Sequence, residues 1–412
     1  MVTENMPAPG DGRETKTGFG AVFSNIRFML LWLGQLTSQL ADRIFVYVLI
    51  IIIYKSTNSN LGVSILFLAF GIPSVLVGPW AGILVDRLNR KWILVVSDVI
   101  RGLLILLAIP LLSGSLIWVF LISLLVYTVA QFFSPAEAST IPEVVEKQNL
   151  IVANSLFMTT WMASSIVGFG LGAPIVSLLA ERNTLVASAI LYFVSATAIL
   201  LISIKARKAV KVNSYVWKDI LIGFEFVRRN LIVRYSLIKL FVATSAGGII
   251  SMLAISYASD VLKIGERNFG YLIIAFGAGT FIGMLILEWI RHYLKMGRII
   301  VLSFLLSGFI LIIMAQAKDI KLALFLILLL GAANIFITST IQTILQQYTP
   351  RPIRGRVFGV VNMLVNSAFT FPIVLFGVVA DIWGIVFAIS LLGLVTVLTG
   401  LIGMFLPEFR TA

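Results

Sequence analysis

The feature that most constrains this chain is a series of apolar stretches, each long enough to cross a lipid bilayer as a helix. A spanning helix needs about 20 apolar residues, and twelve stretches reach that length. We expect them at 28–53, 61–84, 93–112, 116–138, 151–179, 184–204, 235–261, 269–290, 298–316, 321–347, 355–380 and 383–406. Their apolar residues form unbroken runs, unlike the alternation of transmembrane barrels. The sequence therefore predicts an all-α polytopic membrane protein with twelve transmembrane helices.

Composition agrees with this prediction. Apolar residues make up 59% of the chain and charged residues 12%, against about 45–50% and 25% in soluble domains. Soluble enzymes, secreted disulfide scaffolds and disordered proteins are therefore excluded. The chain has no cysteine and a single histidine, His292, so we expect no metal, no cofactor and no catalytic residue. With neither a nucleophile–base constellation nor a phosphate-binding loop, an enzyme is not expected.

The distribution of basic residues predicts the orientation. With the N-terminus inside, 22 of the 31 Lys and Arg residues fall on the inner side, six in outer loops and three within spans. Positive charge concentrates on cytoplasmic loops of membrane proteins. Both termini are therefore expected in the cytoplasm, and the net charge of +13 reflects topology instead of nucleic-acid binding.

The spans fall into two groups of six. The longest inner connection, 205–234, separates a bundle at 28–204 from a bundle at 235–406. We expect 1–27 to be a disordered cytoplasmic tail and 407–412 a short one. Within the connection, one helical face is apolar, which predicts an amphipathic helix on the inner membrane surface. That face comprises Val216, Trp217, Ile220, Leu221, Phe224 and Val227.

Glycines four residues apart recur at intervals of three helices. The pairs are Gly78 and Gly82, Gly168 and Gly172, Gly279 and Gly283, and Gly355 and Gly359. Small residues at this spacing let helix backbones approach closely. Ser-Thr-Ile also occurs twice, at 139–141 and 339–341. These repeats indicate two pseudo-symmetric halves produced by an internal duplication.

Three spans carry polar residues at helical spacing. These are Gln35, Ser38 and Gln39 in the first span, Tyr127 and Gln131 in the fourth, and Asn334, Thr338 and Gln342 in the tenth. Lipid penalises such faces, so they should point toward other helices or water. One interpretation is hydrogen bonding between helices. We favour the wall of a substrate cavity, because the three spans again differ by multiples of three.

Asp42 lies deep within the first span. An ionised carboxylate at that depth costs several kcal/mol unless it is paired. Its candidate role is to bind a coupling proton, with a structural hydrogen-bonding role as the alternative. Arg43 points about 100° away from it and is not an obvious partner. Asp98 and Arg101, three residues apart in the third span, are expected to pair with each other.

The loop at 82–91 reads Gly-Ile-Leu-Val-Asp-Arg-Leu-Asn-Arg-Lys. It resembles the best-known motif of the major facilitator superfamily, with Asn89 replacing a glycine. The resemblance implies an inner gate, in which Asp86 meets the start of the eleventh span near Arg356 and Arg90 pairs with Glu137. The motif residues are Gly82, Asp86, Arg87, Arg90 and Lys91.

Further motifs resemble the bacterial branch of enterobactin exporters and macrolide efflux proteins. They include Phe28-x-x-Leu31-Trp32-x-Gly34-Gln35, Phe133-Ser134-Pro135-Ala136 and Arg354-Gly355-Arg356-Val357. The fifth span departs from the antiporter element, with Phe169 in place of its proline.

The resemblance implies a monomeric exporter in the bacterial cytoplasmic membrane, moving a drug, macrolide or siderophore by proton antiport. A lipid or lysolipid transporter of the same fold and a non-transporting sensor are the alternatives. The implied partners are a small-molecule substrate, protons and the bilayer, without nucleic acid.

Overall fold

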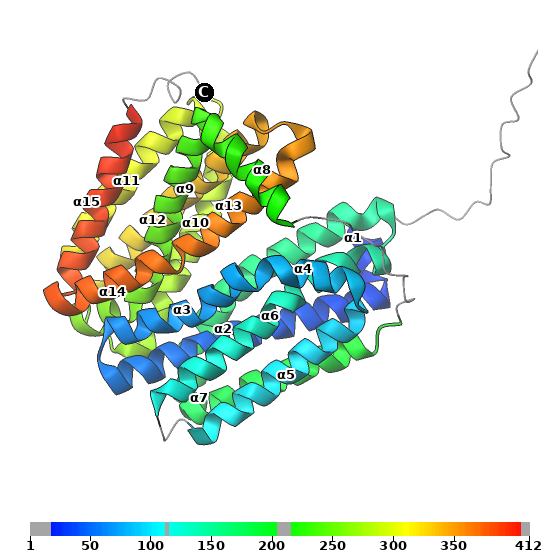
Figure 1. Cartoon of the computed structure of the whole chain (residues 1–412). Helices are drawn as coiled ribbons and strands as arrows, with labels where there is room; N and C mark the ends of the chain where they lie inside the picture. Colours follow the sequence, from blue (N-terminus) through cyan, green and yellow to red (C-terminus); the bar gives the residue numbers. More distant parts are fainter. Residues whose placement is uncertain (1–17, 112–114, 204–215, 405–412) are drawn as a thin grey trace, which may run out of the picture.

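The apolar stretches fold into two helical bundles (Figure 1). The computed structural model describes residues 18–111, 115–203 and 216–404. The N-terminal half contains α1 (Phe19–Phe23), α2 (Ile26–Thr57), α3 (Asn60–Leu76), α4 (Gly78–Arg87), α5 (Arg90–Leu111), α6 (Leu116–Val144), η1 (Lys147–Asn149) and α7 (Leu150–Leu200). The C-terminal half contains α8 (Val216–Arg229), α9 (Leu231–Ser256), η2 (Tyr257–Val261), η3 (Glu266–Asn268), α10 (Gly270–Ile290), α11 (Met296–Gln316), α12 (Ile320–Tyr348), η4 (Arg351–Ile353), α13 (Arg354–Ala368), α14 (Phe371–Trp383) and α15 (Ile385–Met404).

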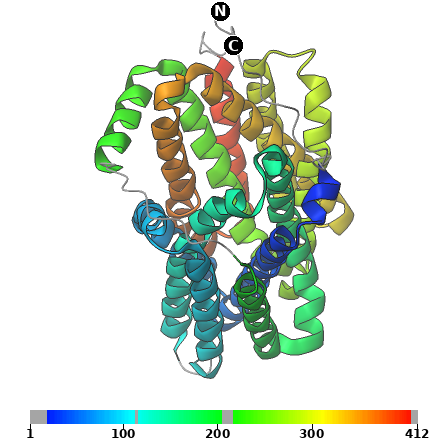
Figure 2. The ribbon, with the colours of Figure 1, turned by 90° about the vertical axis from the view of Figure 1, so that its right-hand side faces the viewer.

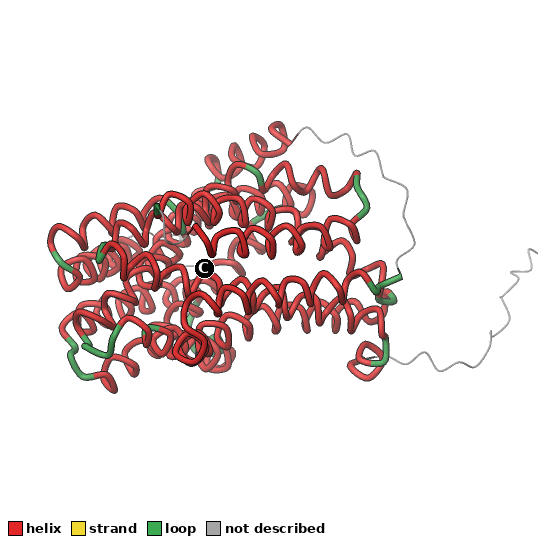
Figure 3. Tube along the Cα trace, turned by 90° about the horizontal axis from the view of Figure 1, so that it is seen from below, coloured by secondary structure: helices red, strands yellow, loops and turns green. Residues whose placement is uncertain are grey.

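The predicted all-α membrane fold is confirmed. Ten helical stretches of the described chain are long and apolar enough to span a membrane. At 51 residues, α7 is long enough to cross twice, since a helix rises about 1.5 Å per residue. The shorter α3 continues into α4. Counting α7 twice, and the pairs α3–α4 and α13–α14 once each, gives twelve crossings among the described helices. Most of the described connections between them are short loops (Figure 3).

Two predicted spans and one predicted loop differ from the expected pattern. The span at 61–84 divides into α3 and α4 at Val77, and the span at 355–380 divides into α13 and α14 at 369–370. A proline lies near the start of each second piece, where its missing N–H is tolerated. The predicted loop between the fifth and sixth spans is reduced to a kink in α7 at Ala180, which has a φ of 60°.

The two segments outside the bundles are partly helical. Residues 19–27 of the expected tail contain α1 and the start of α2, while 1–17 and 407–412 lie outside the described residues. The predicted connecting helix is α8, which packs against α9 and α13 of the C-terminal half (Figure 2). Leu221 and Phe224 of its apolar face are exposed, whereas Val227 is buried. On its polar face, Arg229 hydrogen-bonds to Glu225 at 2.5 Å and lowers the pKa of that carboxyl.

Buried apolar side chains form one shared cluster and two separate ones. The largest joins both halves and includes Phe45 and Ile50 of α2 together with Met252 of α9 and Ile389 of α15. A second cluster, around Phe28, contains only residues of the N-terminal half. The third surrounds Phe304 and contains only residues of the C-terminal half. The bundles therefore share a core at one end and diverge from it, as Figure 1 shows.

Candidate functional site: a cavity between the two halves

The halves meet at the end that carries the α2–α3 turn, the η2–η3 segment and the last turns of α14. We call this the closed end (residues 54–61, 256–269 and 377–383). Here α3 packs against α14, and α7 packs against α10. Gly71 of α3 lies so close to Thr370 that any β-carbon would overlap its side chain, and Gly377 of α14 contacts Ser64 in the same way. Glycine thus allows the two halves to approach closely.

Asp381 of α14 caps the N-terminus of α3 across this interface. Its carboxylate accepts hydrogen bonds from the Ser59 hydroxyl (2.5 Å) and from the backbone N–H groups of Asn60 (2.7 Å) and Leu61 (3.0 Å). The Asn60 amide donates a fourth, at 3.0 Å. A helix N-terminus has unpaired N–H groups and a partial positive charge, so a carboxylate stabilises it. The cap thereby ties one half to the other.

Further polar contacts join the halves around this cap. Ser256 of α9 donates to Asn60 at 2.5 Å, and Tyr54 of α2 donates to Asp260 at 2.9 Å. Two ion pairs also cross the interface: Lys55 with Glu266 at 3.7 Å, and Arg267 with Glu181 at 3.6 Å. Their side chains are partly exposed, so each pair contributes little to the stability of the interface.

A cavity of about 370 Å³ lies between the halves, next to the closed end. This volume falls in the range of about 300–1,000 Å³ that small-molecule sites occupy. Its polar lining comes from both halves, as does its aromatic lining. The polar residues are Arg43, Ser74, Tyr127, Ser251 and Asn366, and the aromatic ones besides Tyr127 are Phe67, Phe70, Phe169 and Phe369.

Asp42 of α2 belongs to a network of polar groups from three helices. Tyr192 of α7 donates a hydrogen bond to its carboxylate. Nη1 of Arg101, from α5, lies 3.4 Å from each carboxylate oxygen. The Asp42 side chain is 25% exposed, so it remains within reach of solvent. Solvent can therefore reach this carboxylate without unfolding of the bundle.

Asp98 occupies the buried side of the same network. Its side chain is 0% exposed, and it pairs with Arg101 as the sequence predicted. Ser38 donates to it at 3.1 Å, and Ser195 donates to its other oxygen. The Arg101 guanidinium also stacks on the Tyr192 ring, 4.5 Å from its centroid. Because Asp98 is itself held by Ser38 and Ser195, it fixes Arg101 in place beside the more accessible Asp42.

The polar residues predicted for the cavity occupy several environments in the N-terminal half. Tyr127 lines the cavity, and Gln131 donates to the Tyr127 carbonyl at 3.2 Å within α6. Gln35 is buried and donates to the Phe157 carbonyl of α7 at 3.2 Å. Ser38 lies in the Asp98 network, and the buried Oε1 of Gln39 has no hydrogen-bond partner in the described chain.

The predicted residues of the tenth span lie within the C-terminal half. Asn334 lines a smaller cavity of about 30 Å³ enclosed by α9, α10, α11, α12 and α15. The Thr338 hydroxyl donates to the Asn334 carbonyl at 2.9 Å, and Gln342 is exposed. Tyr127 thus faces the cavity, whereas Gln35, Gln131 and Thr338 bond between or within helices. Their role in the wall of a substrate cavity stays a prediction.

Arg90 of the loop motif pairs with a different carboxylate from the expected one. Its Nη1 atom lies 2.5 Å from Glu143 and donates to the Ser139 carbonyl at 3.1 Å. The expected partner, Glu137, has a buried Oε1 atom without a hydrogen-bond partner among the described residues. Glu143 lies near the end of α6, where Arg90 at the start of α5 reaches it.

The remaining motif residues lie at the ends of α4, α5 and α13. Arg87 is exposed and Lys91 partly exposed, whereas the side chain of Asp86 lies outside the described part of the structure. Arg356, in the first turn of α13, contacts Gly223 of α8 through its carbonyl. The expected contact of Asp86 with α13 therefore stays a prediction.

The predicted packing glycines differ in their surroundings. Gly168 and Gly172 of α7 contact Arg43 and Tyr47 of α2, and Gly279 and Gly283 of α10 contact α12. A β-carbon on Gly78 would lie 3.4 Å from Gln131, whereas one on Gly82, Gly355 or Gly359 would meet no described atom within 4 Å. Close packing therefore involves the pairs of α7 and α10.

Several residues of the site carried no individual signal in the sequence. Tyr192 and Ser195 stand three residues apart in the sixth span, a spacing that places them on one helical face, yet nothing indicated that this face meets Asp42. Phe67, Phe70 and Asn366 resemble ordinary residues of a spanning helix. Only the packing of the helices assembles them.

Comparison with known proteins adds independent information. The sequence profile described as Major Facilitator Superfamily matches residues 31–372. The chain is 25% identical to the multidrug efflux pump Tap of Mycolicibacterium fortuitum, covering 93% of this chain and 96% of that protein. It is 23% identical to macrolide efflux protein A of Streptococcus pyogenes, covering 87% and 91%.

Solved structures share the fold. The nucleoside transporter NupG superposes with a TM-score of 0.77 at 12% identity, covering 94% of this chain and 99% of that one. A bacterial homologue of the human lysosomal transporter Spinster, in an inward-facing and unoccupied conformation, gives a TM-score of 0.73 at 13% identity, covering 95% and 97%.

Proposed function

Because this chain belongs to the major facilitator superfamily, we propose that it exports small amphiphilic molecules, such as a drug, macrolide or siderophore, by alternating access. The observation that carries the proposal is the cavity lined by both halves and bounded by the closed end. In transporters of this architecture, the substrate site lies near the bilayer midplane between the halves. The multidrug and macrolide efflux relatives support export of such substrates.

We assign the closed end to the outer face of the bacterial cytoplasmic membrane. The argument is the bias of Lys and Arg toward the opposite side, which also carries both ends of the described chain. In this orientation the halves diverge toward the cytoplasm, so a cytoplasmic substrate can enter between them. Export then requires the closed end to open and the opposite end to close.

We further propose proton antiport through Asp42. Its carboxylate is partly exposed, whereas Asp98 is buried and held by hydroxyl groups. Protonation of Asp42 would remove its attraction for Arg101 and weaken the link between α2 and α5. Asp42 also accepts a hydrogen bond from Tyr192 of α7, and both α2 and α7 line the cavity. A change in the packing of these two helices would therefore change the shape of the substrate site.

Efflux from whole cells tests this proposal. Cells expressing the wild type are loaded with a panel of fluorescent dyes and macrolides, and efflux is followed with and without a protonophore. We expect protonophore-sensitive efflux of at least one compound, with loss of driven efflux in Asp42→Asn. Glu288→Gln is the matched control, because it removes an exposed carboxylate from the end of α10.

Each other outcome has a defined meaning. Wild-type efflux rates in Asp42→Asn would overturn the role of Asp42. Efflux that resists the protonophore would overturn proton antiport. If the panel gives no efflux and lysolipid is moved instead, the protein is a lipid transporter. Absence of any flux from purified protein in liposomes would favour a sensor.

A further inference from the structure

Among the described residues that line the cavity between the halves, Arg43 is the one that carries a charge. Its guanidinium lies 6.0 Å from the centre of the Trp161 ring. No carboxylate of the described chain lies within ion-pairing distance of it, and its buried Nε atom has no hydrogen-bond partner there. A cation at this depth in a membrane is costly unless a counter-charge or water compensates it.

The other arginine at this level shows the contrast. Arg101 is 1% exposed and has two carboxylates, Asp42 and Asp98, within 4 Å. These contacts also compensate the charge of Asp42, which points to Arg101 and Tyr192. Asp42 is not among the cavity-lining residues. The carboxylates of Asp42 and Asp98 are therefore already engaged with Arg101.

The other polar groups that the structure describes in the cavity wall are neutral. Ser74, Tyr127, Ser251 and Asn366 can donate or accept hydrogen bonds but cannot neutralise a guanidinium. A cavity with one sign of charge and apolar walls attracts ligands of the opposite sign and repels those of the same sign. A guanidinium is also a donor-only group with five N–H bonds, well suited to carboxylate or carbonyl oxygens.

We propose that Arg43 is the specificity-determining residue of this cavity, binding an oxygen acceptor of an acidic or uncharged amphiphile and excluding lipophilic cations. The inference rests on the proposed export function for its physiological meaning, though binding itself does not depend on transport. Among the substrate classes named above, it favours members without a positive charge.

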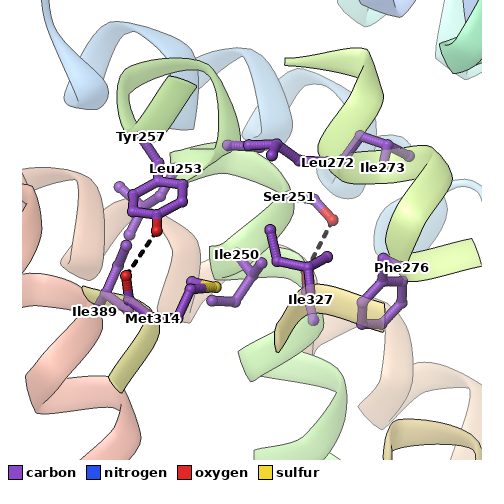
Figure 4. A pocket seen from close by; sticks show the side chains of 12 residues that line it. Ile250, Ser251, Leu253, Tyr257, Leu272, Ile273, Phe276, Met314, Ile327 and Ile389 are labelled. Carbon is purple, nitrogen blue, oxygen red and sulfur yellow. Dashed lines mark hydrogen bonds between the residues drawn. The ribbon is translucent and has the colours of Figure 1, made fainter. Parts of the chain in front are cut away.

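An apolar pocket in the C-terminal half provides the complementary site for the other end of the amphiphile (Figure 4). It measures about 50 Å³ and shares Ser251 and Ile273 with the main cavity. Its two hydroxyl groups are engaged within the protein, since Tyr257 donates to the Met314 carbonyl at 2.6 Å and Ser251 to the Gly247 carbonyl at 2.8 Å. The pocket therefore offers an apolar surface to a small alkyl group.

Two xanthene dyes of similar size test the proposal. Fluorescein is an anion with a free carboxylate, and rhodamine 123 is a cation in which that carboxylate is esterified. Binding to purified protein in nanodiscs is measured by fluorescence anisotropy, without a proton gradient. We expect the wild type to bind fluorescein at least tenfold more tightly than rhodamine 123. Arg43→Gln should lose that preference, Arg43→Lys should retain part of it, and Arg182→Gln, which removes an exposed arginine elsewhere, should keep it.

The outcomes separate this proposal from the proposed function. Equal binding of the two dyes by the wild type, or an unchanged preference in Arg43→Gln, overturns the role of Arg43 whether or not the protein exports anything. An Arg43-dependent preference in a protein that shows no efflux supports this inference and counts against export. If Arg43→Gln does not fold, the dye preference of the wild type and the partial loss of that preference in Arg43→Lys still test the role of Arg43.

Discussion

The two ends of the interface between the halves are built differently. At the closed end, a shared apolar cluster is surrounded by hydrogen bonds and ion pairs that cross from one half to the other. At the opposite end, each half has its own apolar cluster, and α4 packs against α3, α5 and α6 of its own half. The described contacts that hold this conformation are thus concentrated at one end, where a shared apolar cluster and a few polar groups join the halves.

The sequence suggests that the opposite end can close by a related device. Gly377-x-x-x-Asp381 at the end of α14 has the same spacing as Gly82-x-x-x-Asp86 at the end of α4. Asp381 caps α3, and the loop motif implies that Asp86 meets the start of α13. The helix that Asp381 caps, α3, and the helix that Asp86 is expected to meet, α13, each belong to a broken pair, α3–α4 and α13–α14. We expect Asp381 to hold the halves together in the present conformation, and Asp86 to do so when the opposite end is shut.

Removing the Asp381 cap should have the largest effect on the contacts that keep the closed end shut. Asp381→Ala deletes an acceptor of four hydrogen bonds that cross the interface. Hydrogen bonds to a charged group contribute about 1.5–3 kcal/mol, so we expect at least a tenfold shift toward opening of this end. Spin labels on cysteines introduced at Ser56 and Ile382, both exposed, would report it as a longer distance.

Asp319→Ala is the matched control for that experiment. Asp319 also caps a helix, accepting from the Leu322 N–H at 2.9 Å, but the cap lies within the C-terminal half. We expect it to lower thermal stability with no change in the spin-label distance. Identical distance distributions in Asp381→Ala and Asp319→Ala would mean that the cap does not hold the halves together.

A steric change at the helix crossing should have the next largest effect. Gly71→Val places side-chain atoms where Thr370 of α13–α14 now lies, and overpacking of this kind costs about 1–3 kcal/mol. We expect the closed end to loosen and a cysteine introduced at Ser74 to react faster with an impermeant outer reagent. Gly355→Ala is the control, since a β-carbon there meets no described atom within 4 Å. An equal labelling rate in both variants would contradict close packing at Gly71.

The sequence was sufficient for the architecture but not for the contacts between helices. Span positions follow from local apolar content, which needs no knowledge of neighbours. The partners of Asp42 are Arg101 and Tyr192, which are 59 and 150 residues away, so no periodicity could indicate them. Arg90 pairs with Glu143 instead of Glu137 because the start of α5 lies beside the end of α6. Glu143 is one to two helical turns closer to that end than Glu137. The only sequence signal for the break between α13 and α14 at 369–370 is the proline at the start of α14.

The smallest expected effect concerns the ion pairs at the closed end. The Lys55–Glu266 pair joins the halves at 3.7 Å, with side chains 35% and 32% exposed. Exposed pairs contribute about 0.2–1 kcal/mol and are screened by salt. In the same spin-label assay, Glu266→Gln should shift the closed end by less than Asp381→Ala, and the shift should fade at high salt. Glu225→Gln, which breaks a pair within α8, should leave the distance unchanged. A large, salt-independent shift in Glu266→Gln would instead mean that the ion pairs supply much of the free energy that keeps this end closed. The Asp381 cap of α3 would then not be the main contact that holds the halves together.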